Sequence, residues 1–375
     1  MSKLDELIAE LCPDGVEYKL LGDLEKDSIL ELGRGKVISK KTISDNPGKY
    51  PVYSSSAIGE GLMGKYNQYM FDEVLLSWSI DGGGRFFYRN KHKFSLTNVS
   101  GWLRVLRKDV LNIRYLYYVM DSLWLGKTYD YVNKAHPSVI KNDYLIPLPP
   151  LPVQREIVRI LDNFTELTAE LTAELTARRK QYEYYRDLLL TFGDEVEWMI
   201  LSEIAEIGTG SSNTNEELED GKYPFFVRSQ EVRRKNTYEY DETAIITSGD
   251  GVGVGKIFHY VEGKYALHQR AYRIHITDNR VIPKYYFYYM KSAFLPYIEK
   301  SSFHSSVTSI RRPMLNNFPV PVPPLKEQER IVAILDRFDA LCNDLTSGIP
   351  AEIETRQKQY EYYRDKLLSF KEVTA

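Results

Sequence analysis

The sequence predicts an α+β fold with a pseudo-twofold internal repeat: two globular α/β domains separated by two long antiparallel helices that form a coiled coil. The first observation is a near-verbatim repeat, because QYEYYRDLLL at 181–190 returns as QYEYYRDKLL at 359–368. The second is a longer repeat, LPPLPVQREIVRILDNF at 148–164 and VPPLKEQERIVAILDRF at 322–338. The third is that the segments before these blocks keep only a skeleton of similarity. Two copies of one scaffold with two divergent inserts predict two related domains that recognise different things.

The first 24 residues complete this repeat at its far end. DGVE at 14–17 corresponds to DEVE at 194–197, so the start of the chain aligns with the end of the first long helix. The repeat is therefore circular, with 1–24 as an N-terminal segment that closes it. We expect the two termini to lie close together.

Two compact domains are predicted for residues 25–146 and 196–318. In both, short runs typical of strands alternate with turns rich in Gly, Asn and Asp, and one aromatic helix is expected to lie in the core. The expected strand runs are 74–76, 244–247 and 272–276, and the expected aromatic helices are 113–123 and 283–295.

The central segment, 147–195, is expected to act as a spacer made of one long helix over 153–190. Its apolar residues recur every three or four positions between Ile157 and Leu175. The tetrapeptide ELTA occurs three times in tandem at 166–177. One such unit advances a helix by about 6 Å and rotates it by about 40° beyond one turn. A coiled coil tolerates this insertion as a stutter.

The distal segment, 319–375, begins with the same apolar stripe but lacks the tandem. It has TSGIP at 346–350 instead, where Gly348 and Pro350 should kink or restart the helix. From Ile353 the stripe resumes. Both helices are too apolar on one face to stand alone, so we expect them to pack against each other.

The composition favours a soluble, cytoplasmic protein. Cys12 and Cys342 are far apart and have no partner motifs, which argues against a disulfide framework and against a zinc site. The N-terminus has no apolar signal core, and no apolar run reaches the roughly 18 residues of a membrane span. The histidines show no metal-ligand spacing, so no metal is expected.

The net charge of −3 conceals a segregation of charge along the chain. Residues 25–146 carry 18 Lys and Arg against 12 Asp and Glu, and residues 207–318 carry 15 against 12. The remainder carries 16 against 28. Because phosphate binding needs local positive charge, the basic divergent segments are candidates for nucleic-acid contact. Ordinary surface charge is the alternative explanation of such small excesses.

The glycine-rich stretch SGDGVGVGK at 248–256 is interpreted as a hairpin turn. Gly249 and Gly255 are one residue too far apart for a P-loop, and Ile257 stands where its Ser or Thr belongs. The counterpart SIDGGGRFF at 79–87 has no lysine in register. No SAM-binding loop, methylase motif, Ser-His-Asp or Cys-His arrangement is legible in the sequence. We therefore expect a non-catalytic chain without a cofactor of its own.

Candidate DNA contacts are the polar residues of the divergent segments. Arg and Lys can fork onto guanine, Asn and Gln can fork onto adenine, and the others can neutralise or bond phosphate. The candidates of the first segment are Arg34, Lys36, Ser54, Ser55, Ser56, Trp78, Arg85 and Asn98. Those of the second are Arg228, Ser229, Gln230, Arg233, Arg234, Lys256, His268, Gln269, Arg270, Arg311 and Arg312.

The QYEYYRD helix ends are candidates for helix packing or for docking a partner. Their near identity argues for a shared role, because residues that read different sequences would differ between the copies. The candidate residues are Tyr182, Tyr185, Arg186, Tyr360, Tyr363 and Arg364.

These motifs together resemble the specificity subunit of type I restriction-modification systems. They comprise two PPLxxQ(R/E)xIVxILD segments, the QYEYYRDxLL helix ends, the ELTA tandem and the LCPDGVEYKLL start at 11–21. The resemblance covers the whole chain and is greatest to the branch whose central helix carries a four-residue tandem.

The resemblance implies a subunit without an active site that binds a bipartite target in double-stranded DNA. It implies two methyltransferase subunits as partners, which bind SAM, and two restriction subunits as further partners, which use ATP and Mg. Two alternatives remain open: a coiled-coil scaffold that binds only protein, and a nucleotide-binding enzyme that uses the loop at 248–256.

Overall fold

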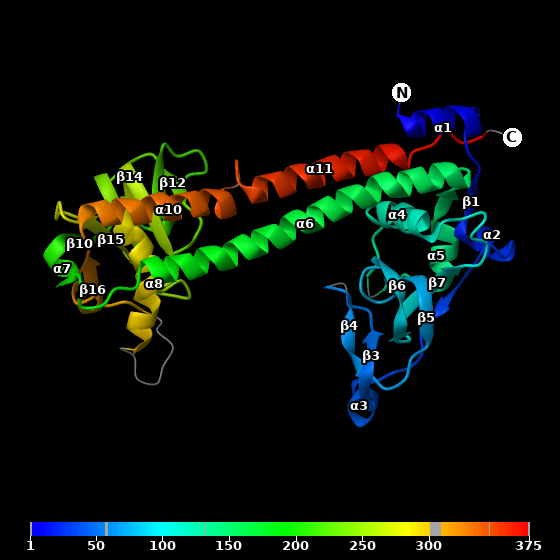
Figure 1. The fold of residues 1–375 in the computed structure, drawn as a ribbon, viewed down its shortest axis with the longest axis horizontal. Coiled ribbons are helices and arrows are strands. Elements are labelled where there is room, and N and C mark those ends of the chain that lie inside the picture. Colours follow the sequence, from blue (N-terminus) through cyan, green and yellow to red (C-terminus); the bar gives the residue numbers. More distant parts are fainter. Residues whose placement is uncertain (1, 57–58, 131, 301–308, 345, 374–375) are drawn as a thin grey trace. The chain divides into compact units, whose positions relative to one another are not determined.

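The computed structural model describes residues 2–56, 59–130, 132–300, 309–344 and 346–373. The chain divides into two compact units (Figure 1). Unit 1 comprises Met1–Glu170 and Ile353–Ala375, and unit 2 comprises Leu171–Glu352. We call the globular parts of these units domain 1 and domain 2.

Domain 1 is built on a six-stranded sheet with the strand order β2-β7-β5-β6-β3-β4. Only the β3–β6 pair is parallel, and the other pairs are antiparallel. A two-stranded β1–β8 sheet lies at the start and end of the domain. The elements are α1 (Lys3–Leu11), β1 (Tyr18–Leu20), α2 (Leu21–Lys26), β2 (Leu30–Arg34), α3 (Lys40–Asp45), β3 (Pro47–Tyr53), β4 (Leu62–Tyr66), β5 (Phe71–Ser79), β6 (Phe86–Leu96), β7 (Ser100–Val105), α4 (Ile113–Trp124), α5 (Pro137–Asp143) and β8 (Leu145–Pro147).

Domain 2 repeats this topology strand for strand. Its sheet has the order β10-β15-β13-β14-β11-β12, and only the β11–β14 pair is parallel. The elements are β9 (Glu197–Ile200), α7 (Leu201–Ile204), β10 (Ala205–Thr209), η1 (Thr214–Glu216), β11 (Tyr223–Phe226), β12 (Arg233–Lys235), β13 (Tyr240–Ser248), β14 (Phe258–Leu267), β15 (Ala271–Ile276), α8 (Pro283–Lys300), α9 (Arg312–Asn316) and β16 (Pro319–Val322). The shared strand order confirms the predicted internal repeat.

Each domain buries one aromatic helix in its core, as predicted. On α4, Tyr115 and Tyr118 are fully buried, and their hydroxyls bond the Pro147 carbonyl and the Asp162 carboxylate. On α8, Tyr285 repeats the first of these bonds with the Pro321 carbonyl at 3.2 Å. Burial of aromatic rings supplies much of the apolar area that holds a core together.

Helix α8 is longer than the expected range of 283–295. It continues to Lys300 because Ile298 is fully buried in the core of domain 2. Pro296 is accommodated inside this helix.

The central helix α6 spans Leu151–Leu189 without interruption, close to the predicted 153–190. Its first part packs into unit 1 through Val153, Ile157 and Leu161, which are fully buried at four-residue spacing. The tandem threonines bond back to carbonyls of the preceding turn; the Thr176 hydroxyl donates to the Thr172 carbonyl at 2.9 Å. Such bonds satisfy a hydroxyl that otherwise competes with the helix.

The distal helix is broken where TSGIP replaces the tandem. Helix α10 (Leu325–Asn343) ends there, and α11 (Ile349–Leu367) begins with Pro350 in its first turn. The Asp344 carboxylate accepts bonds from the Ser347 hydroxyl and from the Thr346 hydroxyl and N–H, which lowers its pKa to about 2. The predicted restart is therefore confirmed. In unit 1, α11 runs antiparallel to the first part of α6 (Figure 1).

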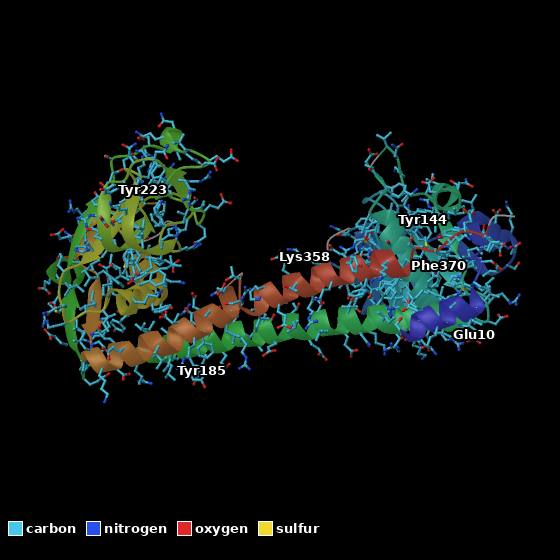
Figure 2. All side chains as sticks on the ribbon, turned by 90° about the horizontal axis from the view of Figure 1, so that it is seen from above. Glu10, Tyr144, Tyr185, Tyr223, Lys358 and Phe370 are labelled. Carbon is cyan, nitrogen blue, oxygen red and sulfur yellow. The ribbon has the colours of Figure 1, made fainter. Side chains whose placement is uncertain are left out.

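The two ends of the chain meet in unit 1. The Val16 N–H donates to the Lys371 carbonyl at 2.8 Å, and the Val373 N–H donates to the Val16 carbonyl at 3.1 Å. Glu10 on α1 and Phe370 beyond α11 lie in this same part of the molecule (Figure 2). This pairing agrees with the expectation from the circular repeat.

Candidate nucleic-acid interface

The same corner of the sheet carries a polar cluster in each domain. In domain 1, β3 ends beside β6, and the Thr97 N–H donates to the Tyr53 carbonyl at 3.0 Å. In domain 2, β11 ends beside β14, and the His268 N–H donates to the Phe226 carbonyl at 2.9 Å. We call this corner the polar edge. It comprises residues 34–36, 54–56, 79–81 and 97–100 in domain 1, and 209–213, 227–229, 248–250 and 268–271 in domain 2.

The polar edge of domain 1 gathers most of the residues predicted for that domain. The Arg34 guanidinium donates two bonds to the Asn98 carbonyl, at 3.0 and 2.7 Å. The Thr97 hydroxyl donates to the Ser54 hydroxyl at 3.1 Å. Lys36 pairs with the same turn through its backbone. Arg34 and Lys36 are exposed, so their charges face solvent.

The hydroxyls of this edge are partly engaged within the domain. The Ser79 hydroxyl donates to the Ser55 carbonyl at 2.7 Å, which links the ends of β3 and β5. Ser54 and Ser55 are half-buried, whereas Ser56 is exposed.

In domain 2 one carboxylate holds two of the predicted arginines. Asp250 accepts from Arg228 at 2.7 Å and from Arg270 at 3.1 Å, on different carboxylate oxygens. Burial of Asp250 opposes ionisation, but the two arginines outweigh it and keep its pKa below the usual value. Both arginine side chains remain exposed, Arg228 at 42% and Arg270 at 62%. Asp250 therefore orients the two arginines, and both side chains remain accessible to a ligand.

The turn between β14 and β15 completes this cluster. His268 is buried, and its Nδ1 accepts the Arg270 N–H at 3.0 Å. Burial, together with the nearby Arg228 and Arg270 charges, lowers the pKa of His268. Gln269 is exposed and donates to the Asn213 amide oxygen at 2.5 Å. Ser229 and Gln230 follow directly after Arg228, and Gln230 is exposed.

Several predicted residues lie away from the polar edge. Arg233 and Arg234 are on the edge strand β12, where Arg233 pairs with Glu217 at 2.7 Å and Arg234 donates to the Gly221 carbonyl at 2.6 Å. Lys256 lies in the β13–β14 hairpin, and Arg85 lies in the equivalent β5–β6 hairpin.

Two further predicted residues lie at the start of α9. Arg311 is its N-cap, and Arg312 donates to the Ile207 carbonyl. Arg312 also lines a cavity of about 480 Å³ with Glu206 and Arg273.

Trp78 is not a surface residue. It is only 1% exposed, and its indole N–H donates to the Ala135 carbonyl at 2.7 Å. The Trp78 indole ring fills the space that a Cβ at Gly101 would occupy, so the ring is tightly enclosed. The expectation of direct DNA contact through Trp78 is therefore corrected: this side chain is a core residue.

The glycine-rich stretches are hairpin connections, as interpreted from the sequence. Residues 80–85 join the antiparallel strands β5 and β6, and residues 249–257 join β13 and β14. A phosphate-binding P-loop leads from a strand into a helix, and a strand follows here instead. Gly255 has a φ of +70°, and a Cβ there would lie 2.7 Å from the Ile298 side chain.

Sequence reasoning missed the residues that organise the polar edge. Asp250 orients Arg228 and Arg270, and Asn213 bonds Gln269. A signal for Asp250 was present, because SGDG in the second copy aligns with SIDG in the first. The domain 1 counterpart, Asp81, pairs with Lys134 at 3.0 Å.

The candidate docking residues of the helix ends occupy matching places in the two units. Tyr363 stacks on Phe164 with ring centroids 5.4 Å apart, and Tyr185 stacks on Phe338 at 5.9 Å. Tyr360 packs against the core of unit 1. The remaining candidates are more enclosed than the stacked tyrosines: Tyr182 and Arg364 are each 8% exposed, and Arg186 pairs with Asp187 at 2.7 Å.

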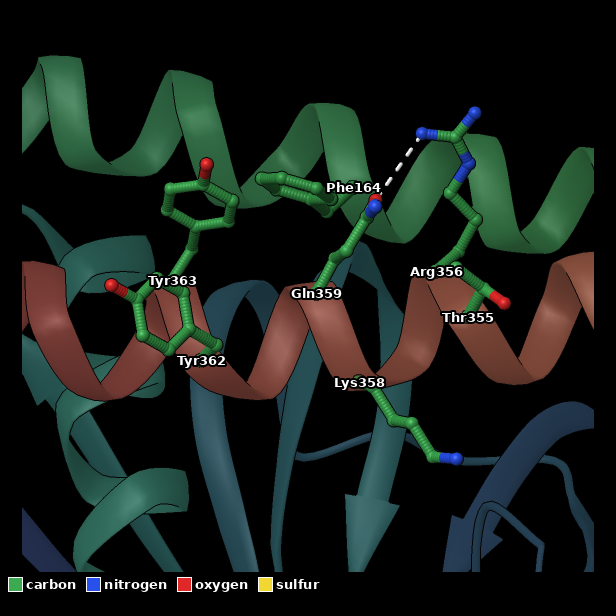
Figure 3. A pocket seen from close by; sticks show the side chains of 7 residues that line it. All are labelled: Phe164, Thr355, Arg356, Lys358, Gln359, Tyr362 and Tyr363. Atoms are coloured by element: carbon green, nitrogen blue, oxygen red, sulfur yellow. Dashed lines mark hydrogen bonds between the residues drawn. The ribbon is translucent and has the colours of Figure 1, made fainter.

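The aromatic helix ends also present rings to solvent. In unit 1, Tyr362 and Tyr363 line a groove of about 560 Å³, with Arg356 donating to Gln359 at 3.3 Å inside it (Figure 3). Tyr362 is 62% exposed, and its repeat counterpart Tyr184 is 64% exposed. Exposed aromatic surface at repeated positions is typical of protein docking sites.

Two kinds of feature are absent from the part of the chain that the structure describes. None of the helices there is both long enough and apolar enough to cross a membrane. Within the same ranges, no group of three or more His, Cys, Asp or Glu side chains could hold a metal ion.

Known proteins share both the sequence pattern and the fold of this chain. The profile of the family described as "Type I restriction modification DNA specificity domain" matches residues 13–178 and 193–355. The specificity subunit of the type I restriction enzyme EcoR124I/EcoR124II of Escherichia coli is 39% identical over 69% of this chain and 71% of its own length. A putative type I restriction enzyme specificity subunit of Haemophilus influenzae is 31% identical over 95% of this chain and 96% of its own.

Solved structures agree on the fold. The S subunit of a type I restriction-modification system from M. genitalium has a TM-score of 0.65 at 17% identity, covering 94% of this chain and 96% of its own. A chain from a study of complex assembly in the type I R-M system has a TM-score of 0.54 at 14% identity, covering 94% and 97%. At such identities the likeness establishes the fold alone, whereas the family match and the curated relatives establish kinship. The chain therefore belongs to the type I restriction-modification DNA specificity family.

Proposed function

We propose that this chain is the DNA-reading subunit of a type I restriction-modification complex and that it recognises a bipartite target. Residues 25–146 would specify one half-site and residues 207–318 the other. The observation that carries the proposal is the polar edge. It lies at the equivalent corner of the six-stranded sheet of each domain, yet different side chains occupy it in the two domains.

The chemistry of the polar edge suits base recognition. Arg228 and Arg270 can each fork onto guanine, and Gln269 can fork onto adenine. In domain 1, Arg34 and Asn98 offer the same two kinds of contact with a different arrangement. Asp250 orients the two arginines before DNA binds, which lowers the conformational cost of forming the base contacts.

The aromatic helix ends would dock the catalytic partners. We propose one methyltransferase subunit at the end containing Tyr362 and Tyr363, and one at the end containing Tyr184 and Tyr185. These partners would bind SAM, and restriction subunits that use ATP and Mg could join them. The chain itself would contribute recognition and placement, and no catalysis.

A scaffold that binds only protein is the alternative that still needs an experiment. Duplexes with and without the target should be tested in gel shifts with the methyltransferase present. Recognition requires a marked preference for the target duplex, whereas a scaffold gives equal shifts or none.

Mapping of methylated adenines supplies the target for that assay. A host that lacks its own adenine methylation would express this chain together with its methyltransferase. The proposal expects one bipartite motif with a fixed gap between its halves. Methylation at unrelated sequences, or a motif that does not depend on this chain, would contradict it.

A further inference from the structure

Both domains carry the same four side chains near the sheet edge formed by β3–β4 and β11–β12. In domain 1, the rings of Tyr50 and Tyr69 meet edge to face, with centroids 5.1 Å apart and an interplanar angle of 63°. In domain 2, Tyr223 and Tyr238 repeat this contact at 5.0 Å and 62°. The geometry is thus nearly identical in two domains whose sequences have diverged.

A lysine lies over each of these rings. In domain 1, the Lys49 ammonium is 5.6 Å from the Tyr50 centroid, and the Lys93 ammonium is 4.7 Å from the Tyr69 centroid. We call these sets the Tyr–Lys quartets. The quartet of domain 2 has Lys222 at 5.2 Å from Tyr223 and Lys264 at 4.6 Å from Tyr238.

Strand register shows that the quartets occupy equivalent positions. Lys93 lies opposite Asp72 in the β5–β6 pair, and Lys264 lies opposite Asp241 in the β13–β14 pair. Tyr50 on β3 lies opposite Tyr66 of the edge strand β4, and Tyr223 on β11 lies opposite Lys235 of the edge strand β12. The quartets are therefore a feature that the repeat has kept.

The lysines of the quartets are open to solvent. Lys49, Lys93 and Lys222 are exposed, and they form no ion pair with any residue that the structure describes. Lys264 is exposed and lies 4.0 Å from Asp241. Tyr69 and Tyr238 are also well exposed, at 45% and 43%. The groups are thus available to an external anion.

We propose that the Tyr–Lys quartets bind the sugar–phosphate backbone of DNA. The inference rests on the proposed function. Side chains that read two different half-sites must differ between the domains, as those of the polar edge do. A DNA contact that stays the same in both domains would be made to what both half-sites share, which is the backbone. Lysine ammonium and tyrosine hydroxyl groups are ordinary phosphate donors.

The surrounding charge makes the two quartets unequal. Residues 36–49 contain four lysines and one aspartate, whereas residues 211–222 contain one lysine and four acidic residues. Helix α3, which carries two of those lysines, packs beside β4. This packing is seen in the contact of Ile43 with Gly64, where an added Cβ would lie 3.1 Å from the Ile43 side chain. The quartet of domain 1 should therefore contribute more to phosphate binding.

The salt dependence of DNA binding tests this inference. The double variant K49Q/K93Q of the full chain, in complex with its methyltransferase, would be titrated with target and random duplexes at several salt concentrations. Each lost phosphate contact lowers the slope of log K against log salt by about 0.9. We expect a loss of about 2 in slope for K49Q/K93Q and a smaller loss for K222Q/K264Q, with equal weakening on both duplexes and the same methylated motif.

Controls separate this inference from the proposed function. K108Q/K326Q makes the same change of net charge at exposed lysines elsewhere, and its slope should equal that of the wild type. Y69F retains the ring and removes the hydroxyl, so it should weaken both duplexes alike without lowering the melting temperature.

Three outcomes would overturn the inference. An unchanged slope in K49Q/K93Q would leave the quartets a purely structural feature. A changed methylated motif would make them base readers, and loss of the methyltransferase with an unchanged slope would make them a protein-docking surface. If the wild-type complex itself shows no preference for the target, the proposed function fails first.

Discussion

Tyr363 on α11 stacks on Phe164 of α6 with ring planes 25° apart. Its repeat counterpart, Tyr185 on α6, stacks on Phe338 of α10 at 26°. The same ring contact therefore joins the two helices of the pair in each unit. Helix α6 contributes the phenylalanine in unit 1 and the tyrosine in unit 2. One sequence motif thus serves the same packing role twice.

Replacing these tyrosines should loosen the helix pairs. Tyr185 and Tyr363 are 38% and 40% exposed. Y185A and Y363A should therefore each lower the free energy of unfolding by about 1–3 kcal/mol, whereas loss of a fully buried aromatic ring costs about 3–5 kcal/mol. We expect lower melting temperatures and weaker co-purification with the methyltransferase, measured on the same preparations. An intact complex with an altered DNA target would refute the packing role.

Removal of the Asp250 carboxylate should weaken recognition of one half-site only. D250N leaves Arg228 and Arg270 without their shared anion, so discrimination at the second half-site should fall by about 1–3 kcal/mol. Binding to duplexes with single base changes in either half measures this loss. D278N is the matched control, since Asp278 also pairs with an arginine, at 2.7 Å, away from the polar edge. Equal losses in both halves would disprove the assignment.

His268 should make the stability of the protein depend on pH. Burial lowers its pKa in the folded chain, so the unfolded chain binds a proton at higher pH than the folded chain does. Its contribution to stability is complete above the unfolded pKa of about 6.5 and declines as the pH falls below that value. H268T installs the residue found at the same place in domain 1, Thr97. Denaturant unfolding at pH 7.5 and 5.5 should show a smaller pH effect in H268T; an equal effect would contradict the prediction.

The ELTA tandem should set the gap between the half-sites. Helix α6 runs unbroken from unit 1 into unit 2, and the tandem lies within it. Deleting residues 170–173 removes about 6 Å of helix, and duplex DNA rises about 3.4 Å per base pair. The gap should shrink by roughly one to two base pairs, with one favoured because each pair also rotates the second half-site by about 34–36°.

The controls for this deletion keep the helix length or increase it. Replacing residues 170–173 with EAAA should leave the gap unchanged, and inserting a fourth ELTA should widen it. Both half-site sequences should persist in every variant. A retained gap with full methylation in the deletion variant would mean that α6 is not the ruler.

Much of the helical scaffold could be predicted from the sequence. Apolar residues at three- and four-residue spacing fixed α6, α10 and α11, and Gly348 with Pro350 marked the break between the last two. The sheets were less accessible, because the parallel pairs β3–β6 and β11–β14 join strands that are distant in the chain.

The arrangement of the polar edge could not be predicted from the sequence. Arg228, Asp250 and Arg270 lie on three separate turns, and only the folded sheet brings them together. The sequence does not distinguish the buried Trp78 from a surface residue, because an aromatic residue between two serines fits a surface pattern as well as a buried one. The Tyr–Lys quartets cannot be read from the sequence, because their members are also scattered along the chain.

Exchange of one recognition segment tests the central claim of bipartite reading most directly. Residues 207–318 would be replaced by the matching segment of a relative that methylates a different sequence, and methylated adenines would be mapped in a host that expresses the hybrid with the methyltransferase. The account predicts that one half of the motif changes to that of the donor, while the other half and the gap stay as in the parent. A motif in which both halves change, or in which neither does, would contradict it.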